Sequence, residues 1–225
     1  MALYQNSVLK KYLKQQDSEE VLKAYKKFTK YFYDTKIQEN IRSSKEEEYQ
    51  GIFLTELFSK ILGYTMKPNA DYNLVAEYKN EKNSRKADGA ILDYNGLKPI
   101  VLAVIELKGT NTKDLEKVRQ QAFDYKANQT GCVYVITSNF EKVRFYINNA
   151  VDFEEFDLFS LKADEFELLY LCLAQENLIN HVPLHIKEAS VQEEEAITKK
   201  FYKDYSTFKR ELFRDLVKLN MKNEV

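Results

Sequence analysis

The feature that most constrains the fold is a pair of apolar segments separated by Asn95-Gly96. Asn-Gly in this setting predicts a β-hairpin with a type I′ turn, because both central residues of that turn need positive φ. We therefore expect two antiparallel strands, over residues 86–94 and 99–107. Two acidic residues, Asp88 and Glu106, interrupt this otherwise apolar hairpin near one end.

Side chains alternate along a strand, so Leu102, Val104, Glu106 and Lys108 are expected on one face of the second strand, with Asp88 on the neighbouring strand. The continuous apolar run that precedes Glu106 is typical of a strand covered on both sides. Carboxylates are rarely placed in such a strand unless they are paired or bind metal. The pattern therefore predicts a divalent-cation site at one end of the sheet.

Asp88 followed by Glu106-Leu107-Lys108 resembles the PD-(D/E)XK nuclease motif, with Ala87 in the place of its proline. The flanking segments that extend the resemblance are residues 87–91, 105–110, 121–126 and 135–146. In this order they are similar to the amino-terminal endonuclease region of type IIG restriction-modification enzymes. Those enzymes fuse nuclease, methyltransferase and target recognition in one polypeptide. The resemblance extends from about Lys45 to the carboxyl end.

The resemblance implies Mg²⁺-dependent hydrolysis of DNA phosphodiesters, with Mn²⁺ as a substitute. Asp88, Glu106 and the backbone carbonyl of Leu107 are the expected metal ligands, since hard cations take oxygen donors. Lys108 lies among acids that stabilise its ammonium form, so its expected role is to orient the attacking water and stabilise negative charge on the phosphate. The structural alternative is that Asp88 starts a turn and Glu106 only pairs with Lys108.

Two further residues are expected to support the site. Glu47 lies on a helix predicted from Ser44 to Leu62, on the face expected to meet the sheet, and related nucleases often use an acid from this helix. Two alternatives stay open, because Glu47 could instead form a capping box with Ser44, and Glu48 could be the acid that matches. Gln121, on the helix after Lys108, is the second supporting residue by resemblance.

The expected fold is α/β and restriction-endonuclease-like, with a central mixed β-sheet flanked by helices and a helical extension at the C-terminus. Apolar spacing divides the chain into a helical arm over residues 1–43, a nuclease core over 44–180 and a helical connector over 181–225. Strands are expected at 72–79, 132–137 and 143–147 besides the hairpin. Other helices are expected at 112–128 and 165–178. Pro183 should separate the last helix from the connector.

Composition limits the partners. A net charge of −1 excludes strong non-specific attraction between the whole chain and DNA phosphates. Double-stranded DNA must therefore be bound by a local basic surface or with the help of other parts of a longer chain. The two cysteines are far apart, no signal peptide or membrane span is evident, and a cytoplasmic location is expected.

The resemblance implies methyltransferase and specificity domains in the same polypeptide, outside this chain, and S-adenosylmethionine would bind only there. It also implies a transient dimer for double-strand cleavage. The alternatives are a repair or junction-resolving nuclease, or a non-catalytic nuclease-like scaffold.

Overall fold

A computed structural model describes residues 3–80, 85–96 and 98–221 of the chain. The outermost residues of the expected 1–43 and 181–225 units lie outside these ranges. Within the described residues one sheet is formed by six strands in sequential order. The strands are β1 (Leu74–Lys79), β2 (Lys86–Asp93), β3 (Ile100–Leu107), β4 (Tyr134–Ser138), β5 (Lys142–Ile147) and β6 (Phe153–Asp157). The sheet is mixed, since β3 and β4 are parallel and the other neighbours are antiparallel.

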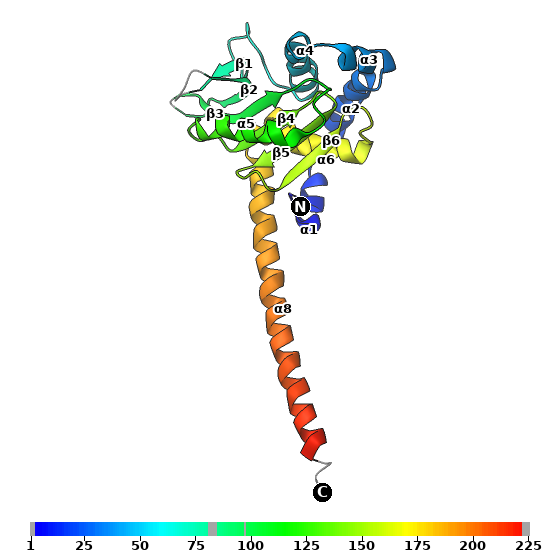
Figure 1. Cartoon of the computed structure of the whole chain (residues 1–225), viewed down its shortest axis with the longest axis vertical. Helices are drawn as coiled ribbons and strands as arrows, with labels where there is room; N and C mark the ends of the chain where they lie inside the picture. Colours follow the sequence, from blue (N-terminus) through cyan, green and yellow to red (C-terminus); the bar gives the residue numbers. More distant parts are fainter. Residues whose placement is uncertain (1–2, 81–84, 97, 222–225) are drawn as a thin grey trace.

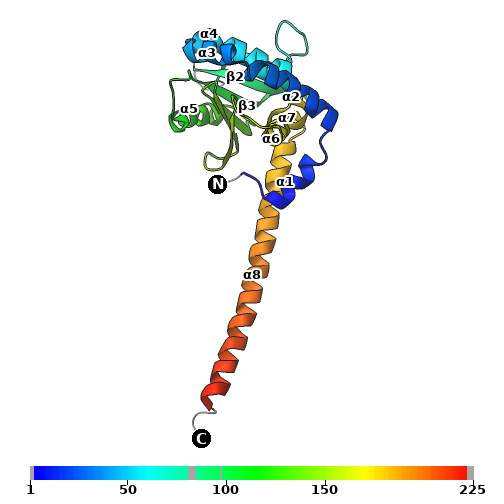
Figure 2. The same cartoon turned by 90° about the vertical axis from the view of Figure 1, so that its right-hand side faces the viewer.

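Helices cover both faces of this sheet (Figure 1). They are α1 (Asn6–Leu13), α2 (Ser18–Phe32), α3 (Thr35–Ser43), α4 (Glu46–Phe53), η1 (Leu54–Ile61), α5 (Leu115–Ala127), α6 (Ala163–Leu173), α7 (Gln175–Ile179) and α8 (Val182–Met221). α4 and α5 lie on opposite faces (Figure 2). The larger core packs α2, η1 and α6 on one face, while a smaller core lies under α5. The expected α/β architecture with a mixed sheet and a C-terminal helix is confirmed.

The β2–β3 hairpin forms as predicted, but its turn does not. Asn95 and Gly96 are not among the residues with positive φ, so the type I′ prediction is wrong. The strands are joined by the longer segment 94–99, in which the amide of Asn95 donates to the Asp93 carboxylate at 2.9 Å. A bulge beside Ile91 also moves Leu102 into the larger core, away from the face of Val104.

The N-terminal helices pack into the main core. Phe28 and Phe32 on α2 are fully buried, Ile41 on α3 is 2% exposed, and all three belong to the larger core. The arm is divided at Asp17, which caps α2 through the amides of its first turn. A division at residue 43 therefore does not separate two hydrophobic cores.

The C-terminal helix α8 begins at Val182 and projects away from the sheet (Figures 1 and 2). Two separate helices form, but the break between them lies at Asn180-His181, and Pro183 is the second residue of α8, where its missing N–H costs no hydrogen bond. The described helices include none with the length and apolarity needed to cross a bilayer.

Candidate active site

Asp88 and Glu106 lie side by side on neighbouring strands. Gly89 pairs with Ile105, and Asp88 and Glu106 are the next residues outward from that pair on β2 and β3. Glu106 is only 1% exposed, although it is a carboxylic acid. The sheet therefore positions the two predicted acids together, one fully buried and the other at its edge.

Asp88 is fixed by the backbone of the opposite strand. Its Oδ2 atom accepts a hydrogen bond of 2.7 Å from the amide of Leu107. Burial raises the pKa of Asp88, while the Leu107 amide, the Lys108 ammonium and the Gln50 side chain lower it in part. Gln50 lies on α4, one turn after Glu46, and was not predicted as a site residue.

Glu106 has one oxygen with partners and one without. Its Oε1 atom accepts from Lys108 Nζ at 3.0 Å and from the Gln121 side-chain amide. The Oε2 atom is buried and has no hydrogen-bond partner. Burial and repulsion from Asp88 raise the pKa of Glu106 to about 7. An acceptor of this kind is suited to a cation or a protonated group.

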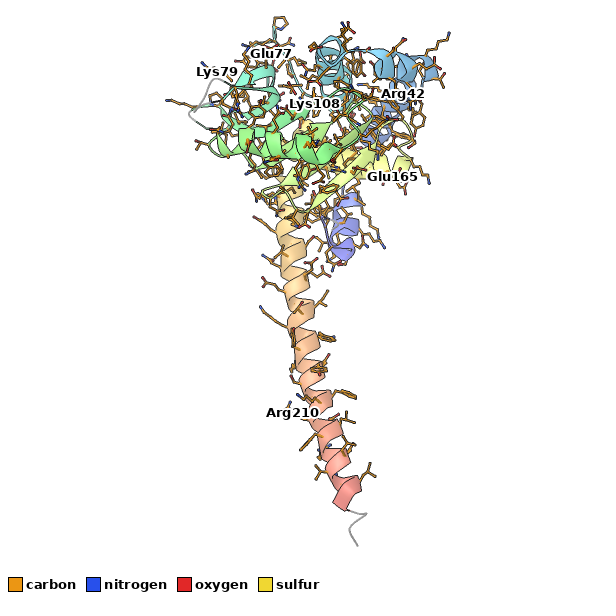
Figure 3. All side chains as sticks on the ribbon, viewed as in Figure 1. Arg42, Glu77, Lys79, Lys108, Glu165 and Arg210 are labelled. Atoms are coloured by element: carbon orange, nitrogen blue, oxygen red, sulfur yellow. The ribbon has the colours of Figure 1, made fainter. Side chains whose placement is uncertain are left out.

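Lys108 lies just after β3 (Figure 3), and its ammonium group contacts three acceptors. It donates to Glu106 Oε1, to the Leu107 carbonyl at 2.9 Å and to Glu46 Oε1 at 3.3 Å. Burial alone would lower the pKa of Lys108, but the carboxylates of Glu106, Asp88 and Glu46 raise it above the ordinary value. Lys108 is therefore a cation at neutral pH, as expected from the sequence.

The helix acid at the site is Glu46, and the prediction of Glu47 is wrong. Glu46 also accepts from the Gly109 amide at 3.1 Å, which ties α4 to the end of β3. Glu47 is exposed, and Glu48 accepts from the Lys45 amide at 3.0 Å as a cap. The predicted Ser44–Glu47 capping box does not form, because the helix begins at Glu46.

The error has a physical cause. The buried residues of α4 are Tyr49 and Phe53, so Glu46 and Gln50 lie toward the sheet. Glu47 shares a helix face with Gly51, which is exposed and has no atom within 4 Å of an added Cβ. The π-helix η1 follows α4 and has more residues per turn than an α-helix. If an α-helical period is assumed from the buried residues of η1 back to the start of α4, the face is displaced by one residue and Glu47 is selected in place of Glu46.

Gln121 reaches Glu106 from α5. Besides Glu106, its amide contacts the hydroxyl of Tyr125 at 3.2 Å, one turn further along α5. Tyr125 is buried against the smaller core, as expected for a packing residue with a polar tip. These two residues also line a polar groove of about 540 Å³, together with Arg85, Lys117, Gln120 and Asp124.

Replacement of Glu46 by alanine should lower stability by about 1–2 kcal/mol, because the Lys108 ammonium and the Gly109 amide each lose an acceptor. The matched control is Glu47→Ala, which should change stability by no more than about 0.5 kcal/mol. Urea unfolding of both variants measures the difference. Equal destabilisation by the two changes would contradict the placement of Glu46 at the site.

The site offers oxygen atoms to a cation. In the part of the chain that the structure describes, no group of three or more His, Cys, Asp or Glu side chains is arranged to hold a metal ion. Two carboxylates, Asp88 and Glu106, and the carbonyl of Leu107 nevertheless lie together, and one carboxylate oxygen lacks a partner. Mg²⁺ is commonly bound by one or two carboxylates with water or phosphate filling the other positions, so these residues fit such an ion.

Comparisons with protein-family models, curated proteins and solved structures give no match. The predicted residues Asp88, Glu106, Lys108 and Gln121 meet at one site, and Glu47 does not join them. Glu46 and Gln50 were missed, and the burial of Tyr49 and Phe53 on the same helix is the signal that could have identified them.

Proposed function

We propose that this chain is a Mg²⁺-dependent endonuclease domain that hydrolyses DNA phosphodiesters. The observation that supports this best is the buried Glu106 carboxylate, which has an unpartnered oxygen and lies beside Asp88 and a charged Lys108. A scaffold has no need for two carboxylates whose burial costs free energy. A cation would offset that cost, and the lysine supplies the positive charge that phosphoryl chemistry requires.

Each residue has a proposed role. Asp88, Glu106 and the Leu107 carbonyl would hold Mg²⁺, which polarises the phosphate and lowers the pKa of bound water. Lys108 orients the attacking water and stabilises negative charge on the phosphate. Glu46 holds Lys108 in place, and Gln121 fixes the Glu106 carboxylate. The groove lined by Arg85 and Lys117 adjoins Gln121, where the DNA backbone would reach the site.

We further propose that the parent protein is a type IIG restriction-modification enzyme and that the fold is restriction-endonuclease-like. The order along the chain of the segments that resemble this family supports the assignment. These segments contain Asp88, Glu106 and Lys108, and Glu46 is the one charged residue of the site that lies outside them. Methyl transfer with S-adenosylmethionine and target recognition would then belong to other domains of the polypeptide, outside residues 1–225.

The test combines cation binding with cleavage. Calorimetry with Mn²⁺ and with Mg²⁺ should detect binding to the chain, and supercoiled plasmid should be nicked when either cation is present and not when it is chelated. A panel that includes four-way junctions and flaps separates a restriction nuclease from a repair nuclease. Absence of cation binding would reject the proposal and favour a scaffold, while binding with cleavage of junctions alone would reject the restriction assignment.

A further inference from the structure

The C-terminal part of α8 leaves many large apolar side chains in solvent. Beyond Glu193, whose carboxylate accepts from the Ser7 hydroxyl, the helix extends away from the rest of the protein (Figure 3). Nine of its large side chains are between 48% and 69% exposed: Leu219, just beyond the stripe, and the eight residues Ile197, Phe201, Tyr202, Tyr205, Phe208, Leu212, Phe213 and Leu216. A solvated helix does not keep such a stripe uncovered, so this surface requires a partner.

The spacing of six of these residues is symmetric. From Ile197 to Leu216 the steps along the stripe are 4, 4, 3, 4 and 4 residues, which read the same in both directions. The six are Ile197, Phe201, Tyr205, Phe208, Leu212 and Leu216. A second copy of the helix running in the opposite direction would therefore place an apolar residue opposite every one of them.

The orientation follows from what covers the start of α8. Ile186 and Ser190 precede Ile197 by eleven and seven residues, which places them on the same side of the helix, and they are 0% and 2% exposed. The protein's own body thus covers this side of the helix at its N-terminal end. A parallel copy would bring a second body into the same space, whereas an antiparallel copy places its body at the far end.

We propose that residues 194–221 of α8 bind the same segment of a second copy of this chain as an antiparallel, two-fold symmetric helix pair. The symmetric spacing places Ile197 opposite Leu216, Phe201 opposite Leu212 and Tyr205 opposite Phe208, each pair occurring twice. This inference does not depend on the proposed nuclease function.

The residues flanking the stripe support the same pairing. In a two-fold antiparallel pair, each flank of one helix lies against the same flank of the other helix. Tyr202 of one copy therefore contacts Phe213 of the other copy on one flank. On the other flank Lys200 lies opposite Glu211, which are opposite charges. Eight side chains of this size and exposure would bury about 800 Å² per copy, which is the area of a stable interface.

Sedimentation equilibrium of the chain over a wide range of concentration tests the proposal. We expect a species with twice the mass of one chain, and the double variant F201E/L212E should weaken the dimer at least about 100-fold, because it buries four glutamates. The matched control is A196E/S206E, which adds the same charge on the back of the helix and should dimerise as the parent does. Circular dichroism confirms that both variants are folded.

Cross-linking tests the orientation. The native cysteines are buried, so a mixture of the Ile197→Cys and Leu216→Cys variants should form mixed disulfides, while Ile197→Cys alone should form almost none. Efficient self-linkage of Ile197→Cys would overturn the antiparallel arrangement. A chain that stays monomeric at every concentration would overturn the proposal and indicate a different protein segment as the partner.

Discussion

Replacement of Glu106 by glutamine is expected to reduce the rate of cation-dependent DNA cleavage by a factor on the order of 10³. The same change is expected to raise the free energy of unfolding of the metal-free protein at pH 8. Glutamine keeps an oxygen for the Gln121 amide and for Lys108, but removes the negative charge. Burial disfavours the charged carboxylate and Asp88 repels it, so removing the charge relieves both unfavourable contributions. We expect a gain of about 2 kcal/mol at pH 8.

The pH dependence of this gain has a definite sign. The folded pKa of Glu106 is about 7, above its ordinary value of 4.5, so the folded protein holds this proton more tightly than the unfolded chain. Stability from this group is therefore greatest below pH 4.5, falls as the pH rises from 4.5 through about 7, and levels off above that. Glu106→Gln should lack this fall, and cation affinity of the parent protein should weaken as the pH drops below 7.

Urea unfolding between pH 6 and pH 8 measures these effects, together with plasmid nicking at saturating Mn²⁺. The control is Glu47→Gln, an exposed acid on α4, which should follow the parent protein in both assays. Destabilisation of Glu106→Gln at pH 8 would show that the carboxylate is already well compensated by Lys108, and retained cleavage would refute the role of Glu106 as a ligand.

Replacement of Lys108 by methionine is expected to reduce cleavage by a factor of about 10²–10³ while cation binding is retained. Lys108 donates to the Leu107 carbonyl, one of the proposed ligands, so its removal frees that oxygen. Affinity for Mn²⁺ should therefore stay the same or rise. This separates the lysine, which acts on the phosphate and the water, from Glu106, which binds the ion.

Single-turnover cleavage and calorimetry with Mn²⁺ provide the two measurements. Lys86→Met is the matched control, because Lys86 also lies on the hairpin but pairs with Glu77 in solvent. Loss of cation binding together with cleavage in Lys108→Met would contradict the separate roles assigned to the two residues.

The hairpin and its chemistry could be predicted from the sequence because they depend on local patterns. Alternation and β-branched content locate β2 and β3 to within a residue, and pairing of the two strands then brings Asp88 and Glu106 together. Lys108 follows Glu106 by two residues and therefore reaches the same side. These relations need no knowledge of the tertiary structure.

The errors arise where packing overrides local pattern. The π-helical turns of η1 occur where Leu54, Leu57 and Phe58 are buried together, and no propensity of the sequence indicates them. Strand β6 was missed because three of its five residues, Phe153–Asp157, are acidic. It lies at the sheet edge, where Glu155 pairs with Arg144 and Glu154 accepts a hydrogen bond from the Leu3 amide.

The burial of α2 in the main core has a consequence for synthesis. The Tyr33 hydroxyl, just after α2, donates to the carbonyl of Leu161, 128 residues later in the chain, and Phe28 packs against Phe166 on α6. At a bacterial or eukaryotic rate of about 5–20 residues per second, the aromatic face of α2 waits roughly 6–25 s on the ribosome before its partners emerge. A nascent chain in this state offers a binding surface to chaperones.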